Sequence, residues 1–117
     1  MYGVKDKSKA FAIRIVNLYK YLTIDSINKE FVMSKQILRS GTSIGANIAE
    51  GSQGQSRADF ISKMNIALKE ATETEYWLDL LYETNYINAE MYESVVADNR
   101  ELIKMLISIV KNTKNEK

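Results

Sequence analysis

Three carboxylates, Glu50, Glu70 and Glu73, are the side chains of this sequence best suited to chemistry. If they converged in space, they would offer oxygen ligands to Mg²⁺ or Ca²⁺. Ion pairs with Arg39 or Lys69 are the favoured interpretation. Acid–base catalysis by paired carboxylates would need a substrate cleft, and a narrow helical core leaves little room for one. We therefore expect no catalytic residue, no metal and no cofactor.

The sequence lacks the residues of most other catalytic sites. It contains no histidine and no cysteine, which excludes Ser-His-Asp and Cys-His catalysis and the Glu-x-x-His motif of di-iron bundles. The segment 51–55 has two glycines but lacks the GK[ST] of a phosphate-binding loop. The missing cysteines and the missing signal-peptide core predict a cytoplasmic location, and no apolar run is long enough to span a membrane.

The three glutamates belong to a larger polar set with helical spacing. Its members between positions 40 and 50 step by three, four and three residues, so they share one helix face, and those at 70 and 73 share another. If the two faces meet, they form an inter-helix hydrogen-bond network that fixes register, because a buried polar group needs a partner. A solvated surface is the alternative. The set comprises Arg39, Ser40, Ser43, Asn47, Glu50, Lys69, Glu70 and Glu73.

A strip of very small residues runs beside this polar face. Gly41, Gly45 and Ala49 recur every four residues, and each glycine costs about 1 kcal/mol of helix propensity relative to alanine. Close approach by another helix or by a large side chain would offset that cost. We expect Trp77 and Tyr76 to fill the groove. The spacing resembles a membrane-dimer motif, but charged residues interrupt any apolar span.

Four helices in a single domain, residues 1–117, must position these residues. The chain has 45% apolar and 26% charged residues and no proline, which favours long uninterrupted helices. Apolar periodicity predicts helices at about 7–22, 30–50, 57–85 and 89–111. Short connections imply antiparallel neighbours, so the predicted fold is an all-α, antiparallel up-down four-helix bundle.

Local signals predict how these helices begin and end. We expect residues 1–6 to be a loose lead-in and Ser8 to cap the first helix. Gly51 lies where a C-terminal cap glycine belongs, and Ser56 and Asn88 are candidate N-caps of the third and fourth helices. The last two turns of the fourth helix are apolar over more than half of their circumference, which predicts contact with another subunit.

The charge distribution is uneven although the net charge is only +1. Residues 1–24 carry five basic and one acidic side chain, and residues 57–87 carry three basic and six acidic ones. An up-down bundle would place Asp25, Glu30, Asp79, Glu83, Glu90 and Glu93 at one end. The other end would bind phosphates in a salt-dependent way, or its cations would simply keep the protein soluble. This basic end comprises Lys5, Lys7, Lys9, Arg57, Lys63, Lys111, Lys114 and Lys117.

The region from Lys35 to Leu78 resembles the bacterial four-helix-bundle family of 23S rRNA intervening-sequence proteins. The resemblance rests on KQ at 35–36, RS at 39–40, SIG at 43–45, NI at 47–48 with Glu50, Ser56 with DF at 59–60, KE at 69–70, Glu73 and WL at 77–78. It implies a bundle that assembles into a ring, commonly a pentamer. A related group, the accessory proteins of diversity-generating retroelements, binds nucleic acid and a reverse transcriptase. No catalytic activity is established for the family.

Three functions compete. The first is a non-catalytic, oligomeric scaffold that binds RNA or a reverse-transcriptase-like nucleoprotein through the basic end. The second is a protein–protein adaptor without a nucleic-acid role, because the near-neutral charge departs from the strongly basic character expected of the retroelement relatives. The third, a small metal- or ligand-binding bundle, rests only on the glutamates.

Overall fold

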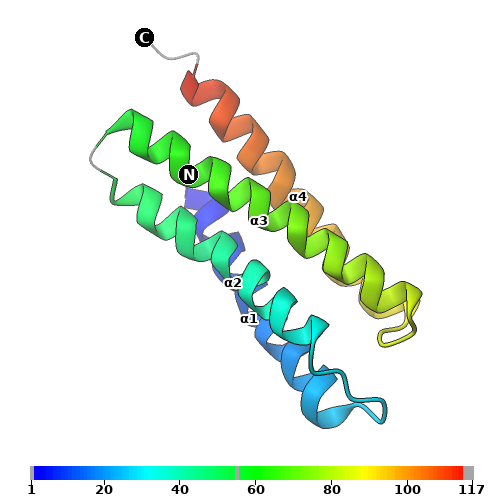
Figure 1. Ribbon diagram of the computed structural model, residues 1–117. Helices are drawn as coiled ribbons and strands as arrows, with labels where there is room; N and C mark the ends of the chain where they lie inside the picture. Colours follow the sequence, from blue (N-terminus) through cyan, green and yellow to red (C-terminus); the bar gives the residue numbers. More distant parts are fainter. Residues whose placement is uncertain (1, 55, 115–117) are drawn as a thin grey trace.

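The protein is a bundle of four antiparallel helices, described by a computed structural model for residues 2–54 and 56–114 (Figure 1). Helix α1 spans Tyr2–Lys20 and continues into a π-helical turn, η1, at Tyr21–Asp25. Helices α2, α3 and α4 span Met33–Ser52, Arg57–Glu83 and Ala89–Lys114. The described part of the chain contains no strand, so the predicted all-α four-helix fold is confirmed. None of its helices is both long enough and apolar enough to traverse a lipid bilayer.

The up-down arrangement gives the bundle two distinct ends (Figure 1). The start of α1, the α2–α3 connection and the end of α4 meet at one end, at the upper left, which we call the terminal end. The connections 26–32 and 84–88 meet at the opposite, distal end. The described residues extend 53 Å along the bundle and about 20 Å across it, so the two ends are well separated.

The core is a continuous apolar column contributed by all four helices. Its largest fully buried side chains include Phe11, Ile15, Ile44, Leu78 and Leu106. Burying each such side chain stabilises the fold by about 1.5–3 kcal/mol. Helix α2 packs most extensively on α3, and the α1–α4 pair has the smallest contact of the neighbouring pairs.

The first helix begins earlier than the sequence predicts. Val4 is fully buried, and this burial extends α1 to Tyr2, so the expected loose lead-in is wrong for residues 2–6. Ser8 is not a cap. It lies buried inside α1, where its hydroxyl donates a hydrogen bond to the Lys5 carbonyl over 3.0 Å.

The second helix differs from prediction at both ends. It begins at Met33 because the Glu30 carboxylate lies just before it and accepts hydrogen bonds from the backbone N–H groups of the first turn. Gly51 is not a C-terminal cap. It is buried within α2, where an added Cβ would lie 2.6 Å from Met64 Cε. No glycine among the described residues has a positive φ.

The predicted caps of the third and fourth helices are confirmed. The Ser56 hydroxyl accepts a hydrogen bond from the Asp59 backbone N–H over 3.1 Å. The Asn88 side-chain oxygen accepts one from the Met91 backbone N–H over 2.8 Å. Both caps satisfy N–H groups that have no partner inside the helix, which is why local sequence sufficed to locate them.

Candidate functional site

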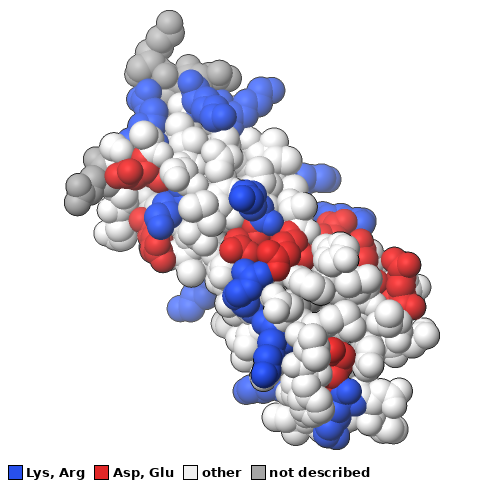
Figure 2. Space-filling model, viewed as in Figure 1, with Lys and Arg blue, Asp and Glu red and all other residues white. Residues whose placement is uncertain are grey.

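The terminal end gathers most of the predicted basic residues. Figure 2 shows Lys and Arg side chains at this end, at the top of the view. These side chains come together because α1 begins, α2 connects to α3, and α4 ends at the terminal end. Lys117 lies outside the described residues. The described members are Lys5, Lys7, Lys9, Arg57, Lys63, Lys111 and Lys114.

These cations differ in how far their charge is compensated. Lys7 forms an ion pair with Glu101 over 2.6 Å, and the hydrogen bond to that carboxylate raises the pKa of Lys7. Lys63 forms one with Glu50 over 2.8 Å, and Arg57 also has an interaction partner. Four lysines are exposed and form no ion pair with any described residue: Lys5, Lys9, Lys111 and Lys114.

A groove of about 420 Å³ lies between α1 and α2 next to two of these lysines. Lys5 and Lys9 line it on the α1 side. Small residues of both helices form much of the remaining lining: Ala12, Gly45, Ala46 and Ala49. Part of the small-residue strip is therefore open to solvent and forms a groove beside Lys5 and Lys9, which have no ion-pair partner among the described residues.

The small-residue strip faces α1, so the prediction that Trp77 and Tyr76 fill it is wrong. An added Cβ at Gly41 would lie 2.7 Å from Ile15 Cγ1, and one at Gly45 would lie 3.3 Å from the Ser8 carbonyl oxygen. Ala49 is exposed. Successive residues of a helix point about 100° apart, so the strip is turned away from the face of α2 that meets α3.

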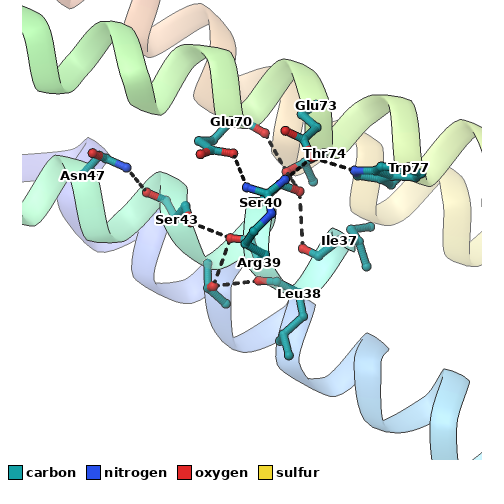
Figure 3. Close-up of polar contacts among 11 residues, drawn as sticks. Ile37, Leu38, Arg39, Ser40, Ser43, Asn47, Glu70, Glu73, Thr74 and Trp77 are labelled. Carbon is teal, nitrogen blue, oxygen red and sulfur yellow. Dashed lines mark hydrogen bonds and ion pairs between the residues drawn. The ribbon is translucent and has the colours of Figure 1, made fainter. Parts of the chain in front are cut away.

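Arg39 cross-links α2 to α3 (Figure 3). Its guanidinium donates to Glu70 over 3.1 Å and also pairs with Glu73. Trp77 Nε1 donates to the same Glu73 carboxylate over 2.9 Å, and its ring meets Tyr76 edge to face. The favoured ion-pair interpretation therefore holds for Arg39. The Arg39 side chain is 48% exposed, so each pair contributes at most about 1 kcal/mol.

A buried hydroxyl pair lies next to Arg39 in the same interface. The oxygens of Ser40 and Thr74 are 2.9 Å apart, and Thr74 Oγ1 is 2.8 Å from the Glu70 carbonyl (Figure 3). Both residues are fully buried. The sequence interpretation missed Thr74, although it occupies the apolar stripe of α3 between Ala71 and Leu78 at helical spacing. A polar residue within an apolar stripe indicates a buried hydrogen bond, and this signal could have identified Thr74.

The rest of the predicted network does not bridge the two helices. Ser43 donates to the Arg39 carbonyl and Asn47 donates to the Ser43 carbonyl, both within α2 (Figure 3). Lys69 makes no hydrogen bond or ion pair with the described residues. Glu50 pairs with Lys63 instead of joining the other two glutamates. In the described ranges, no group of three or more acidic side chains is placed to hold a metal ion.

The distal end is less acidic than predicted. Glu30 is buried against the start of α2, and two exposed lysines, Lys29 and Lys35, belong to the connection 26–32 and to the first turn of α2 at the same end. Figure 2 accordingly shows Lys and Arg side chains near this end as well. The acidic excess of the distal end is therefore smaller than the six predicted carboxylates imply.

Asp79 and Tyr92 join α3 to α4 towards the distal end. The Tyr92 hydroxyl donates to Asp79 over 2.6 Å, and this hydrogen bond, helped by burial, raises the pKa of Tyr92 from 10.0 to about 12.

The hydrogen bond from the protonated Tyr92 hydroxyl should contribute fully to stability below pH 10. This contribution should be lost as the pH rises through 12. We expect Tyr92→Phe to lower stability by about 1 kcal/mol near neutral pH. The difference from the unmodified chain should shrink above pH 12 in urea unfolding.

Tyr76→Phe is the matched control, because the Tyr76 ring is 58% exposed and its hydroxyl has no hydrogen bond to the described residues. It should unfold like the unmodified chain at every pH. Equal stability of the Tyr92 and Tyr76 variants at neutral pH would show that the Asp79 bond contributes nothing.

Comparison with known proteins relates this chain to a protein family and to solved structures. The model of the family described as 23S rRNA-intervening sequence protein matches residues 2–108. A crystal structure described as a protein with unknown function from the S23 ribosomal protein family, from Bacteroides thetaiotaomicron VPI-5482, is 68% identical in sequence. The match covers 94% of this chain and 96% of that one, with a TM-score of 0.91. No curated protein matches this chain.

Proposed function

Because the chain belongs to the family of 23S rRNA-intervening sequence proteins, we propose that it is a non-catalytic, oligomeric scaffold that binds RNA through its terminal end. The S23 relative is described as having unknown function, so the proposal rests on the residues of this chain. A ribonucleoprotein would be recognised through the same phosphate chemistry.

The four lysines of the terminal end that form no ion pair with any described residue carry this proposal. Lys5 and Lys9 stand on α1, and Lys111 and Lys114 stand on the last turns of α4. Each lysine that neutralises a phosphate releases a counterion, which lowers the slope of log K against log salt by about 0.7 for a single strand. Four contacts predict a slope of about −3, so a fourfold rise in salt should weaken binding about 50-fold.

Self-assembly would place several terminal ends side by side. The apolar face predicted at the end of the fourth helix is present in part, since Ile107 is 51% exposed whereas Ile103 and Ile109 are half-buried. Ile13 on α1 is also exposed. A ring of parallel subunits, with a pentamer favoured by the family resemblance, would gather the lysines on one rim and raise RNA affinity through multivalency.

The test is a titration of fluorescently labelled single-stranded RNA with the full chain at several salt concentrations. We expect binding at low salt with a steep negative salt slope. Lys5→Glu combined with Lys9→Glu should weaken binding at least about tenfold and flatten the slope. Light scattering on the same samples would give the mass of the assembly.

Lys35→Glu combined with Lys69→Glu is the matched control, because it makes the same change in net charge at exposed sites away from the terminal end. It should retain most of the affinity. Absence of binding at low salt, or an equal loss in both double variants, would refute RNA binding through the terminal end. A monomeric mass would refute the scaffold.

A further inference from the structure

The end of η1 and the connection to α2 expose four large apolar side chains in nine consecutive positions, 24–32. Ile24 is 65% exposed, Ile27 98%, Phe31 55% and Val32 73%. We call these four residues the distal patch, since they lie at the distal end of the bundle. Single exposed apolar residues are ordinary on a protein surface, but four of them within nine consecutive residues indicate a contact site.

The segment is held in place by backbone hydrogen bonds. The Ser26 N–H donates to the Tyr21 carbonyl over 2.8 Å, and the Glu30 N–H donates to the Leu22 carbonyl over 2.9 Å. The Glu30 carboxylate then fixes the start of α2 through three further hydrogen bonds. The segment therefore cannot fold back to bury its apolar side chains without breaking these bonds, and the distal patch is preorganised to meet a partner.

We propose that the distal patch binds the same patch of a second copy of this chain, so that two bundles associate end to end. The charges of the segment favour this partner. Asp25 and Lys29 are both exposed and lie two residues to either side of Ile27. In a two-fold contact residue i meets residue j while j meets i. A two-fold axis near Ile27 would therefore place each Asp25 opposite the Lys29 of the other copy.

The local hydrogen bonding leaves these charges available. The Lys29 ammonium donates one hydrogen bond, to the carbonyl of its own Ser26 over 3.2 Å, and keeps two further donors for a carboxylate. Asp25 makes no ion pair with any described residue. The contact would consist of an apolar centre, made by Ile27 and its neighbours, flanked by two symmetric ion pairs.

This association leaves both terminal ends free and pointing in opposite directions. It is independent of RNA binding and of the side-by-side contacts of a ring. A stable interface buries roughly 800 Å² on each partner, which is more than four side chains supply. We therefore expect a weak, concentration-dependent contact for single bundles, strengthened by avidity where several copies present their distal patches together.

The test is the mass of the full chain by light scattering over the micromolar to millimolar range. The unmodified chain should approach twice the mass of its basic assembly as concentration rises. Ile27→Asp should abolish the doubling while leaving the basic assembly intact. Because the Ile27 side chain is 98% exposed, this variant should fold normally, and circular dichroism would check that.

Charge exchange tests the two-fold geometry. Asp25→Lys and Lys29→Asp should each weaken the doubling, and the double variant should restore it. A mass that never doubles, a doubling that persists in Ile27→Asp, or a double variant that fails to restore it would overturn the proposal. The first of these results would assign the distal patch to a partner other than this chain. The variants Lys5→Glu and Lys9→Glu should not alter the doubling, so RNA binding and end-to-end association can fail separately.

Discussion

Glu30→Ala is expected to lower the free energy of unfolding by about 2–3 kcal/mol. The Glu30 carboxylate accepts hydrogen bonds from the backbone N–H groups of Val32, Met33 and Ser34 over 3.0, 2.9 and 2.6 Å. Its negative charge also faces the positive end of the α2 dipole. Only 7% of Glu30 is exposed, so water cannot fully replace the lost acceptor. Urea unfolding followed by circular dichroism would measure the change.

Glu93→Ala is the control for Glu30→Ala. It removes an exposed carboxylate that makes no hydrogen bond to the described residues, and its effect should stay within about 0.5 kcal/mol. Glu30→Gln should give an intermediate loss, because an amide offers one acceptor oxygen instead of two. Similar stabilities for the Glu30→Ala and Glu93→Ala variants would show that the three hydrogen bonds are not needed to start α2. A destabilised start of α2 should also disorder the distal patch.

Gly41→Ala is expected to destabilise the bundle by about 1–2 kcal/mol although alanine is the better helix former. The substitution gains about 1 kcal/mol of helix propensity, but overpacking a tight core costs typically about 1–3 kcal/mol. The upper end of that range applies because the added methyl group would lie 2.7 and 2.9 Å from the two γ carbons of Ile15. These carbons are close to the α1 backbone and fully buried, so they have little freedom to move.

Gly51→Ala is a matched control within the same helix. Its new methyl group would meet Met64 Cε at 2.6 Å and Lys63 Cβ at 3.0 Å. The Met64 methyl group is the end of a flexible side chain, so the shorter of the two contacts can be relieved more easily than the contact with the γ carbons of Ile15. We expect Gly51→Ala to be less destabilising than Gly41→Ala. A double-mutant cycle with Ile15→Ala would test the assigned contact, because removing both γ carbons should make Gly41→Ala tolerable. Purely additive effects would show that α1 does not set the requirement for glycine.

The helices themselves could be predicted from the sequence because their signals are local. The apolar period of α2, α3 and α4 and the caps at Ser56 and Asn88 all lie within a few residues of the feature they specify. The errors arose where a distant contact decided the outcome. Burial of Val4 extends α1 to Tyr2, and burial of Gly51 beneath Met64 carries α2 beyond its expected end.

The candidate site was predicted less completely than the fold. The pairing of Arg39 with Glu70 and Glu73 followed from facing helical surfaces. The ion pair between Lys7 and Glu101 joins residues 94 positions apart. Helical periodicity within one segment cannot predict a pair between such distant positions. The sequence could therefore nominate cations for the terminal end, but it could not tell which of them already had a carboxylate partner.

The sequence by itself determined the helical class, the lengths of the main helices to within a few residues and the absence of histidine and cysteine chemistry. Each of these depends on residue type and on spacing along one helix. Only the tertiary structure decided that the Gly41 strip faces α1, that Glu50 pairs with Lys63 instead of lying with the other glutamates, and that four lysines have no ion-pair partner among the described residues. The physical reason is that neighbouring residues point about 100° apart on a helix. A small rotation of one helix against the next therefore exchanges the partners of a whole face.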